Sequence, residues 1–263
     1  MQNCSLTVVG AGIKTISHIT IEVEAYIEQS EKVLYMVNTP GLKEWIKTKN
    51  KNTESLEGFY QKHALRFHCY RDITEHVLEE TRKGQHVCMV LYGHPTIFAQ
   101  SGVDAVIRAK KEGIDAKILP GISAEDCLLA DLMINPGHYG CQSFEATDLL
   151  ICHRQWDLRS HLIIWQVGII GALGTVPDDF DNTHGAQLLQ ERLLKNYNAD
   201  HKVILYEAAQ YPEFEPKIAE FELCNLVNAK FSEKCTLYVP PTQKAKYDSL
   251  VLDSLGIDLK DLN

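Results

Sequence analysis

The 263-residue chain lacks several features that would assign it to a specialised class of protein. None of its eight cysteines forms a CxxC pair, so a metal site or a disulfide framework is not indicated. The N-terminus, MQNCSLTVVG, has neither the charged segment nor the apolar core of a signal peptide. The longest apolar stretch, residues 162–176, is too short to span a bilayer. We therefore expect a soluble, cytoplasmic protein with reduced thiols.

Basic residues are also scarce relative to acidic ones. The chain has 26 Lys and Arg against 35 Asp and Glu, which gives a formal net charge of −9. This balance argues against the broad basic surface that nucleic-acid binding requires. Apolar residues make up 45% and charged residues 23%, as in ordinary globular proteins. The length suffices for one large domain or two α/β lobes.

Strand-like and helix-like patterns alternate along the first part of the chain. Compact apolar runs predict strands, and apolar residues at helical spacing predict helices between them. The expected strands are residues 5–9, 32–37, 86–92 and 115–119, and the expected helices are residues 16–27, 72–83 and 98–111. Such alternation predicts an open, mainly parallel sheet with helices on its faces.

A break at Pro120-Gly121 divides the chain into two parts. Beyond it, Ser123 can cap a helix over residues 124–133, with Asp126 as its acidic partner. Strand-like runs at residues 149–153, 161–167, 202–207 and 235–239 and a helix at residues 186–195 complete the pattern. The fold class expected is α/β, with lobes at residues 1–119 and 120–263 and a ligand cleft between them.

The glycine-containing run VVGAGIKTI, residues 8–16, resembles a dinucleotide-binding fingerprint but departs from it twice. Thr15 takes the place of the third glycine, and the second strand ends at Asn38 rather than at an acid. A glycine turn after a first strand can also serve only close backbone approach. A nicotinamide-dependent dehydrogenase is therefore a distant alternative.

Three motifs together resemble the tetrapyrrole methylase superfamily. They are Val8–Gly12, Tyr92–Pro95 and Pro120–Ala124. The resemblance implies a two-lobed fold that binds S-adenosylmethionine (SAM) in a cleft between the lobes. The usual small-molecule members carry a Gly-Asp-Pro-type turn where this chain has Gly93-His94-Pro95, which indicates a narrower group.

A larger set of residues is similar to the borosin methyltransferases, which α-N-methylate peptide backbones, as in omphalotin biosynthesis. The set comprises Leu91–Phe98, Phe144–Asp148, Trp165–Gly171 and the constellation Tyr60, Arg66 and Tyr70. Fungal members fuse their own substrate to the C-terminus, whereas this chain stops at Asn263 after an acidic, helix-like tail. The resemblance therefore implies the split type: a homodimer that iteratively methylates a separately encoded precursor, as a heterotetramer with two precursors.

The resemblance also implies catalytic roles for four residues. A peptide nitrogen is a poor nucleophile because its lone pair is delocalised into the carbonyl. Arg66 would hold the amide oxygen as charge develops there. Tyr60 and Tyr70 would hydrogen-bond to the amide or accept its proton, with the nearby arginine favouring the phenolate form. Tyr92 would bind the SAM carboxylate or complete the amide pocket.

The residues expected to contact SAM follow two turns and a strand. They are Tyr92, His94, Ile97, Phe98, Ser123, Ala124 and Gln166. No metal is expected. His94 could instead serve turn geometry, and Gln166 could be a satisfied core amide. Glu145 and Asp148 could cap the next element or pair with Arg154, and we expect no chemical role for them.

Two other classes of function remain open on the sequence. One is a small-molecule methyltransferase acting on a tetrapyrrole or a similar acceptor, which would turn over without a protein partner. The other is a non-catalytic module that binds SAM or a peptide and regulates another protein. Without the family resemblance, Tyr60, Arg66 and Tyr70 could equally be packing residues at a lobe surface.

Overall fold

The computed structural model describes residues 4–177 and 179–262. Its contacts divide the chain into two compact units. The first unit comprises the residues up to 134 together with segments 171–180 and 206–218, and the second comprises 135–170, 181–205 and the residues from 219 onward. The lobe boundary expected at residues 119–120 lies inside the first unit, and two later segments return to that unit.

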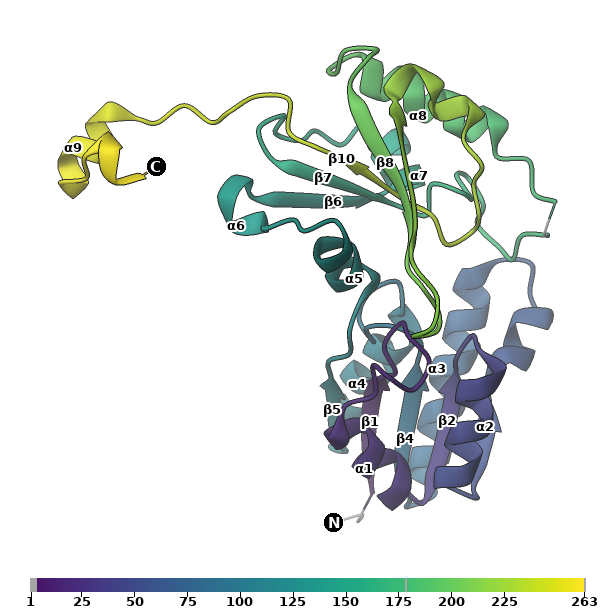
Figure 1. The fold of residues 1–263 in the computed structure, drawn as a ribbon. Helices are drawn as coiled ribbons and strands as arrows, with labels where there is room; N and C mark the ends of the chain where they lie inside the picture. Colours follow the sequence, from purple (N-terminus) through teal and green to yellow (C-terminus); the bar gives the residue numbers. More distant parts are fainter. Residues whose placement is uncertain (1–3, 178, 263) are drawn as a thin grey trace. The chain divides into compact units, whose positions relative to one another are not determined.

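Five parallel strands form the sheet of the first unit, in the order β3-β2-β4-β1-β5 (Figure 1). They are β1 (Ser5–Gly10), β2 (Lys32–Met36), β3 (Thr53–Ser55), β4 (His86–Leu91) and β5 (Asp115–Leu119). The register pairs Gly10 with Leu91 and Val9 with Leu119. Because β1, β4 and β5 end level with one another, the loops that follow them begin at the same edge of the sheet.

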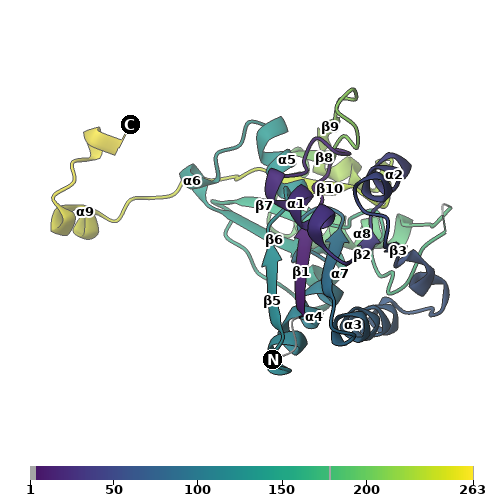
Figure 2. The ribbon, with the colours of Figure 1, turned by 90° about the horizontal axis from the view of Figure 1, so that it is seen from below.

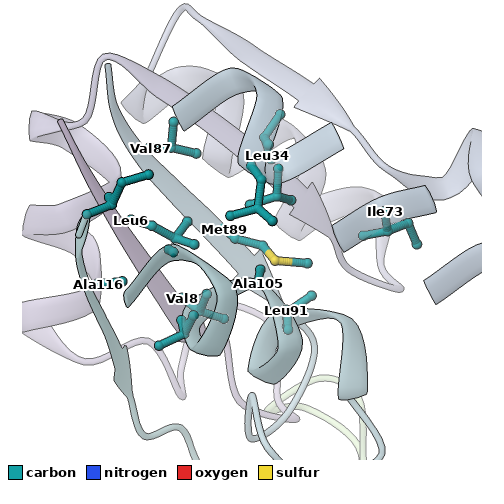
Figure 3. Packing of buried hydrophobic residues seen from close by; sticks show 14 of the residues in the cluster. Leu6, Val8, Leu34, Ile73, Val87, Met89, Leu91, Ala105 and Ala116 are labelled. Carbon is teal, nitrogen blue, oxygen red and sulfur yellow. The ribbon is translucent and has the colours of Figure 1, made fainter. Parts of the chain in front are cut away.

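Helices cover both faces of this sheet, as the view in Figure 2 shows. They are α1 (Ile21–Gln29), α2 (Pro40–Lys49), α3 (Arg66–Arg82) and α4 (Gln100–Lys111), with the 3₁₀ turn η1 (Glu57–Gln61) before α3 and α5 (Ala124–Asp131) after β5. Successive strand residues point to opposite faces. Val8 belongs to one core cluster together with Ile73 of α3 and Ala105 of α4 (Figure 3), whereas Val9 belongs to a second cluster together with residues of α1 and α2.

A second five-stranded sheet, in the order β6-β7-β10-β8-β9, belongs to the second unit except for the end of β8 and the start of β9, which fall in segment 206–218. The strands are β6 (Cys141–Glu145), β7 (His161–Trp165), β8 (Lys202–Glu207), β9 (Lys217–Glu222) and β10 (Thr236–Val239). The helices are α6 (Pro136–Tyr139), α7 (Ala146–Ile151), α8 (Thr183–Leu194), η2 (Leu223–Asn228), α9 (Ser249–Leu255) and η3 (Leu259–Leu262). Leu162 and Ile164 of β7 pack with Leu189 and Leu193 of α8 in its core.

Most of the strands expected from the sequence are confirmed. β1, β2, β4, β5, β7 and β8 each begin at the expected residue. The strand expected at residues 149–153 is wrong, because residues 149–151 belong to α7. The Glu145 carboxylate accepts the Asp148 N–H at 2.7 Å and so caps this helix, while Leu149 is fully buried. Arg154 pairs with Asp148 at 2.7 Å.

Helix α3 begins at Arg66, six residues before the helix expected at 72–83. A helix leaves its first N–H groups without partners inside the helix. Here the Arg66 N–H donates to the carbonyl of Leu173 at 3.0 Å. A contact more than a hundred residues away in the sequence therefore stabilises the early start, and it also fixes Arg66 at the N-terminus of α3.

All eight cysteines lie in the described residues and all are free thiols. Five of them are buried, Cys141 is half-buried, and Cys152 and Cys224 are exposed. Among the described helices, none combines the length and apolar character that a membrane-crossing segment needs.

Buried hydroxyl and thiol groups make the stability of the fold sensitive to alkaline pH. Burial raises the pKa of Tyr197 from 10.0 to about 12 and that of Cys88 from 9.0 to about 12. The unfolded chain loses these protons first, so the folded state binds more protons in this window and its stability falls as pH rises. We expect the free energy of unfolding, measured in urea, to be independent of pH below pH 9 and to fall steeply between pH 10 and 12.

The variant Tyr197→Phe should reduce this slope by up to about 1.4 kcal/mol per pH unit, the value for one titrating group. Tyr247→Phe is the matched control, because that side chain is 57% exposed. An unchanged slope in Tyr197→Phe would contradict the assignment of the alkaline transition to this buried phenol.

Candidate active site

Three glycines bring the backbones of three loops into contact at the carboxyl edge of the first sheet. Gly10 ends β1, Gly93 follows β4 and Gly121 follows β5. A Cβ on Gly10 would collide with the carbonyl oxygen of Gly93 and lie 2.9 Å from the Cα of Gly121. A Cβ on Gly121 would lie 2.6 Å from the same carbonyl oxygen. Only glycine at positions 10 and 121 permits this approach, so the three sequence motifs that contain these glycines lie together.

The β1 loop is held against the β4 loop by backbone hydrogen bonds. Gly12 and Gly93 exchange N–H donors at 3.2 and 3.0 Å. His18 also braces this loop, because its Nδ1 accepts the N–H groups of Ile13 and Lys14, both at 3.2 Å. Burial and then the charge of Lys14 lower the pKa of His18, which keeps the ring neutral and Nδ1 free to accept.

Tyr92 lies at the end of β4, and its hydroxyl accepts a hydrogen bond from Nε2 of Gln210 at 2.8 Å. Nδ2 of Asn38 donates in turn to Oε1 of Gln210. Burial raises the pKa of Tyr92, and the amide donors of Gln210 and Asn38 offset this only in part. The phenol therefore stays protonated at neutral pH and can act as a hydrogen-bond donor.

The turn after Tyr92 presents apolar side chains to solvent. Nδ1 of His94 accepts the N–H of Thr96 at 3.3 Å and lies 3.0 Å from its hydroxyl, so this ring nitrogen braces the turn. Ile97 and Phe98 are 38% and 47% exposed. Phe98 has a φ of 52°, in the left-handed region that side chains other than glycine rarely adopt outside turns and functional sites.

Ser123 and Ala124 begin α5, and the expected capping box is present. The Ser123 hydroxyl accepts the Asp126 N–H at 3.1 Å, and the Asp126 carboxylate accepts the Ser123 N–H at 2.7 Å. The Ser123 N–H is therefore already bound within the capping box. Ala124 carries a small side chain at the first position of α5.

Tyr60, Arg66 and Tyr70 come together in the first unit. Arg66 and Tyr70 lie four residues apart on one face of α3. The rings of Tyr60 and Tyr70 pack edge to face with centroids 6.3 Å apart. Nε of Arg66 donates to the carbonyl of Gly174 at 3.1 Å, which fixes the plane of the guanidinium group.

The phenolate form of Tyr60 is disfavoured, contrary to the expectation from its arginine neighbour. Burial is the largest cause that raises the pKa of Tyr60 well above its ordinary value, and the charge of Tyr70 and the hydrogen bond to it raise it further. The positive charge of Arg66 lowers it by less. Tyr60 is therefore a neutral hydrogen-bond donor, because desolvation outweighs the attraction of a single cation.

Gln166, the remaining expected residue, belongs to the second unit. It follows β7, is half-buried, and has a φ of 56°. Its carbonyl accepts the N–H of Ile169 at 3.1 Å and so begins a turn. The other expected site residues all belong to the first unit.

Sequence patterns gave no indication of two residues that orient this site. Gln210 and Gly174 lie in the segments 206–218 and 171–180 that return to the first unit. Neither belongs to a motif, and their partners are more than a hundred residues away in the sequence. A Cβ on Gly174 would collide with the carbonyl oxygen of Ala64, so close packing requires glycine there.

A second group of ionisable residues lies away from this edge. Glu54, His76 and Glu80 place ligand atoms within 4.8 Å of one another. Lys32 pairs with Glu54 at 2.8 Å and Lys83 with Glu80 at 2.6 Å. Because the lysines already neutralise both carboxylates, this arrangement is explained by ion pairing.

Comparison with known proteins agrees with this architecture. Residues 5–221 match the family described as Tetrapyrrole (Corrin/Porphyrin) Methylases. The uroporphyrin-III-C-methyltransferase from Thermus thermophilus superposes with a TM-score of 0.65 at 17% sequence identity, over 91% of this chain and 93% of that chain. The class of protein is thus an α/β tetrapyrrole-methylase fold. The chain belongs to the tetrapyrrole methylase family.

More similar relatives are fungal. The methyltransferase/ribosomally synthesized cyclic peptide lentinulin A precursor of Lentinula edodes is 38% identical over 255 residues, and the omphalotin A precursor of Omphalotus olearius is 39% identical over 241 residues. The matches cover 95% and 90% of this chain but 61% and 58% of those proteins. The chain therefore spans about three fifths of the length of these relatives.

The glycine contact gives a direct prediction. Gly10→Ala should lower the free energy of unfolding in urea by about 3 kcal/mol, because a methyl group would force apart the β1, β4 and β5 loops. Gly58→Ala is the control, since its Cβ would meet no atom within 4 Å. Equal effects of the two substitutions would contradict the close approach of the three loops.

Proposed function

We propose that this chain is a SAM-dependent methyltransferase that iteratively α-N-methylates backbone amides of a separately encoded precursor peptide. The observation that carries the proposal is the fixed guanidinium of Arg66 beside the paired rings of Tyr60 and Tyr70. Membership of the tetrapyrrole methylases supports methyl transfer. The relatives named both as methyltransferase and as cyclic peptide precursor support a peptide acceptor.

The carboxyl edge of the first sheet suits SAM as the cofactor. The exposed side chains of Ile97 and Phe98 can pack on the apolar faces of an adenine ring, and the protonated hydroxyl of Tyr92 can donate to a carboxylate. Ala124 would contribute a further contact, and Ser123 and His94 would shape the loops. SAM, when bound, supplies a methyl group on a sulfonium that is already a good leaving group.

Arg66 addresses the main difficulty of the reaction, which is the low nucleophilicity of an amide nitrogen. Its Nε is bound to the Gly174 carbonyl, so the guanidinium is held before any substrate arrives. The terminal nitrogens can then donate to the oxygen of a peptide bond as negative charge develops on it. Donors that are oriented in advance need no reorganisation during the reaction.

The two tyrosines would have different roles, one as a hydrogen-bond donor and the other as the acceptor for the amide N–H. Tyr60 stays protonated and acts as a donor to Tyr70. Tyr70 is then left to accept a hydrogen bond from the amide N–H, and its phenolate form would take that proton, directly or through a water molecule, to become the neutral phenol. The constellation grips only backbone groups. An extended peptide, whose successive side chains alternate in direction, could therefore present one amide after another.

The assembly that we propose is a homodimer that binds two precursors.

Mass spectrometry of co-expressed proteins tests the function. Small proteins encoded beside this chain would be co-expressed with it, purified and fragmented to locate added methyl groups. We expect mass increments of one methylene on consecutive backbone nitrogens. Turnover of a tetrapyrrole without any protein partner would favour the small-molecule alternative. SAM binding without any S-adenosylhomocysteine, with all candidate acceptors, would favour a binding module.

Arg66→Ala should lower methylation of the precursor by at least about a hundredfold, the usual effect of removing an oriented donor to a developing oxyanion. SAM binding by calorimetry should be unchanged. Arg71→Ala on the same helix is the control, because its side chain is 61% exposed and pairs weakly with Asp72 at 3.7 Å. Near wild-type turnover in Arg66→Ala would exclude the proposed role of this residue.

A further inference from the structure

Gln210 joins three loops at the carboxyl edge of the first sheet. Its backbone carbonyl accepts the N–H of Thr15 in the loop after β1, at 2.8 Å. Its Nε2 donates to the hydroxyl of Tyr92 at the end of β4, at 2.8 Å. Its Oε1 accepts from Nδ2 of Asn38, which follows β2. One glutamine therefore contacts all three loops through groups of fixed polarity.

The contact with Asn38 determines which end of the Gln210 amide faces Tyr92. Because the Asn38 donor occupies Oε1, the amide must turn its NH₂ group toward the phenol. An NH₂ group can donate but cannot accept. The oxygen of Tyr92 is therefore an acceptor in this pair, and its own proton is directed away from Gln210.

Burial of Tyr92 strengthens this effect. Desolvation is the largest cause that raises the pKa of the phenol, so the hydroxyl keeps its proton at neutral pH. Within the described part of the chain, the groups that hydrogen-bond to this phenol are the amide donors of Gln210 and Asn38. The proton is thus available to an acceptor that enters the site.

We infer that Gln210 is a positioning residue that makes Tyr92 a hydrogen-bond donor toward the carboxylate of bound SAM. The inference rests on the proposed function, because it takes SAM as the ligand of this edge. A glutamine that only braced the loops would need no particular polarity at the Tyr92 contact. A glutamine that sets the direction of the Tyr92 proton requires an NH₂ group at that position.

Gln210→Glu distinguishes these roles, because it keeps the shape of the side chain and reverses its polarity. The carboxylate would still accept from Asn38 but would also accept the hydrogen bond of the Tyr92 hydroxyl, which would then point toward residue 210 and away from SAM. We expect calorimetry at pH 7.5 to show SAM binding weakened by roughly 10- to 100-fold, the effect of losing a hydrogen bond to a charged group. Gln29→Glu, on the exposed surface of α1, is the control for added charge.

The pH dependence of SAM binding provides a signature that a merely structural role would not give. A protonated glutamic acid can donate to Tyr92 again, and its ordinary pKa is about 4.3. The ratio of wild-type to Gln210→Glu affinity should therefore shrink as pH falls from 7.5 toward 5. In a Tyr92→Phe background, which has no phenol proton to redirect, Gln210→Glu should have a much smaller effect.

Each outcome of these measurements has a distinct meaning. Wild-type affinity in Gln210→Glu, alongside weakened binding in Tyr92→Phe, would overturn the inference and leave the proposed function intact. Failure of the wild-type chain to bind SAM would overturn both. If Gln210→Glu does not fold, as judged by thermal melting, Asn38→Ala replaces it. That variant frees the Gln210 amide to rotate, and we expect several-fold weaker SAM binding, whereas unchanged affinity would again overturn the inference.

Discussion

The close approach of Gly10, Gly93 and Gly121 is the constraint on which the rest of the site depends. Three parallel strands end level with one another, and their loops can meet only if no side chain stands between them. The contact aligns the end of β4, where Tyr92 lies, with the N-terminus of α5. A single added methyl group at this point would displace both.

Polarity at the site is set by segments that return from later in the chain. Segment 171–180 supplies the Gly174 carbonyl that holds Arg66, and segment 206–218 supplies the Gln210 amide that faces Tyr92. In both cases an amide group fixes the direction of a charged or hydroxylic side chain. Preorganisation of this kind is what the proposed reaction needs, because an amide nitrogen is weakly nucleophilic.

The order of the strands and helices was largely predictable, because compact apolar runs bounded by glycine, proline and charged residues identify buried strands well. The strand predicted at residues 149–153 was wrong, because periodicity cannot separate a short buried strand from a short helix. The Glu145 cap stabilises the helix at this place. The predicted start of α3 was also wrong, because the first N–H of the helix donates to the carbonyl of Leu173, which is far away in the sequence.

The sequence by itself determined the fold class, the three glycine motifs and the identity of most candidate site residues, since these depend on local patterns and on family resemblance. Tertiary structure alone decided how those residues are oriented and in which protonation state they stand. Tyr60 shows the difference: its neighbour Arg66 was visible in the sequence, but burial outweighs that charge and keeps the phenol neutral. Desolvation depends on what surrounds a group in space, and a one-dimensional pattern does not contain that information.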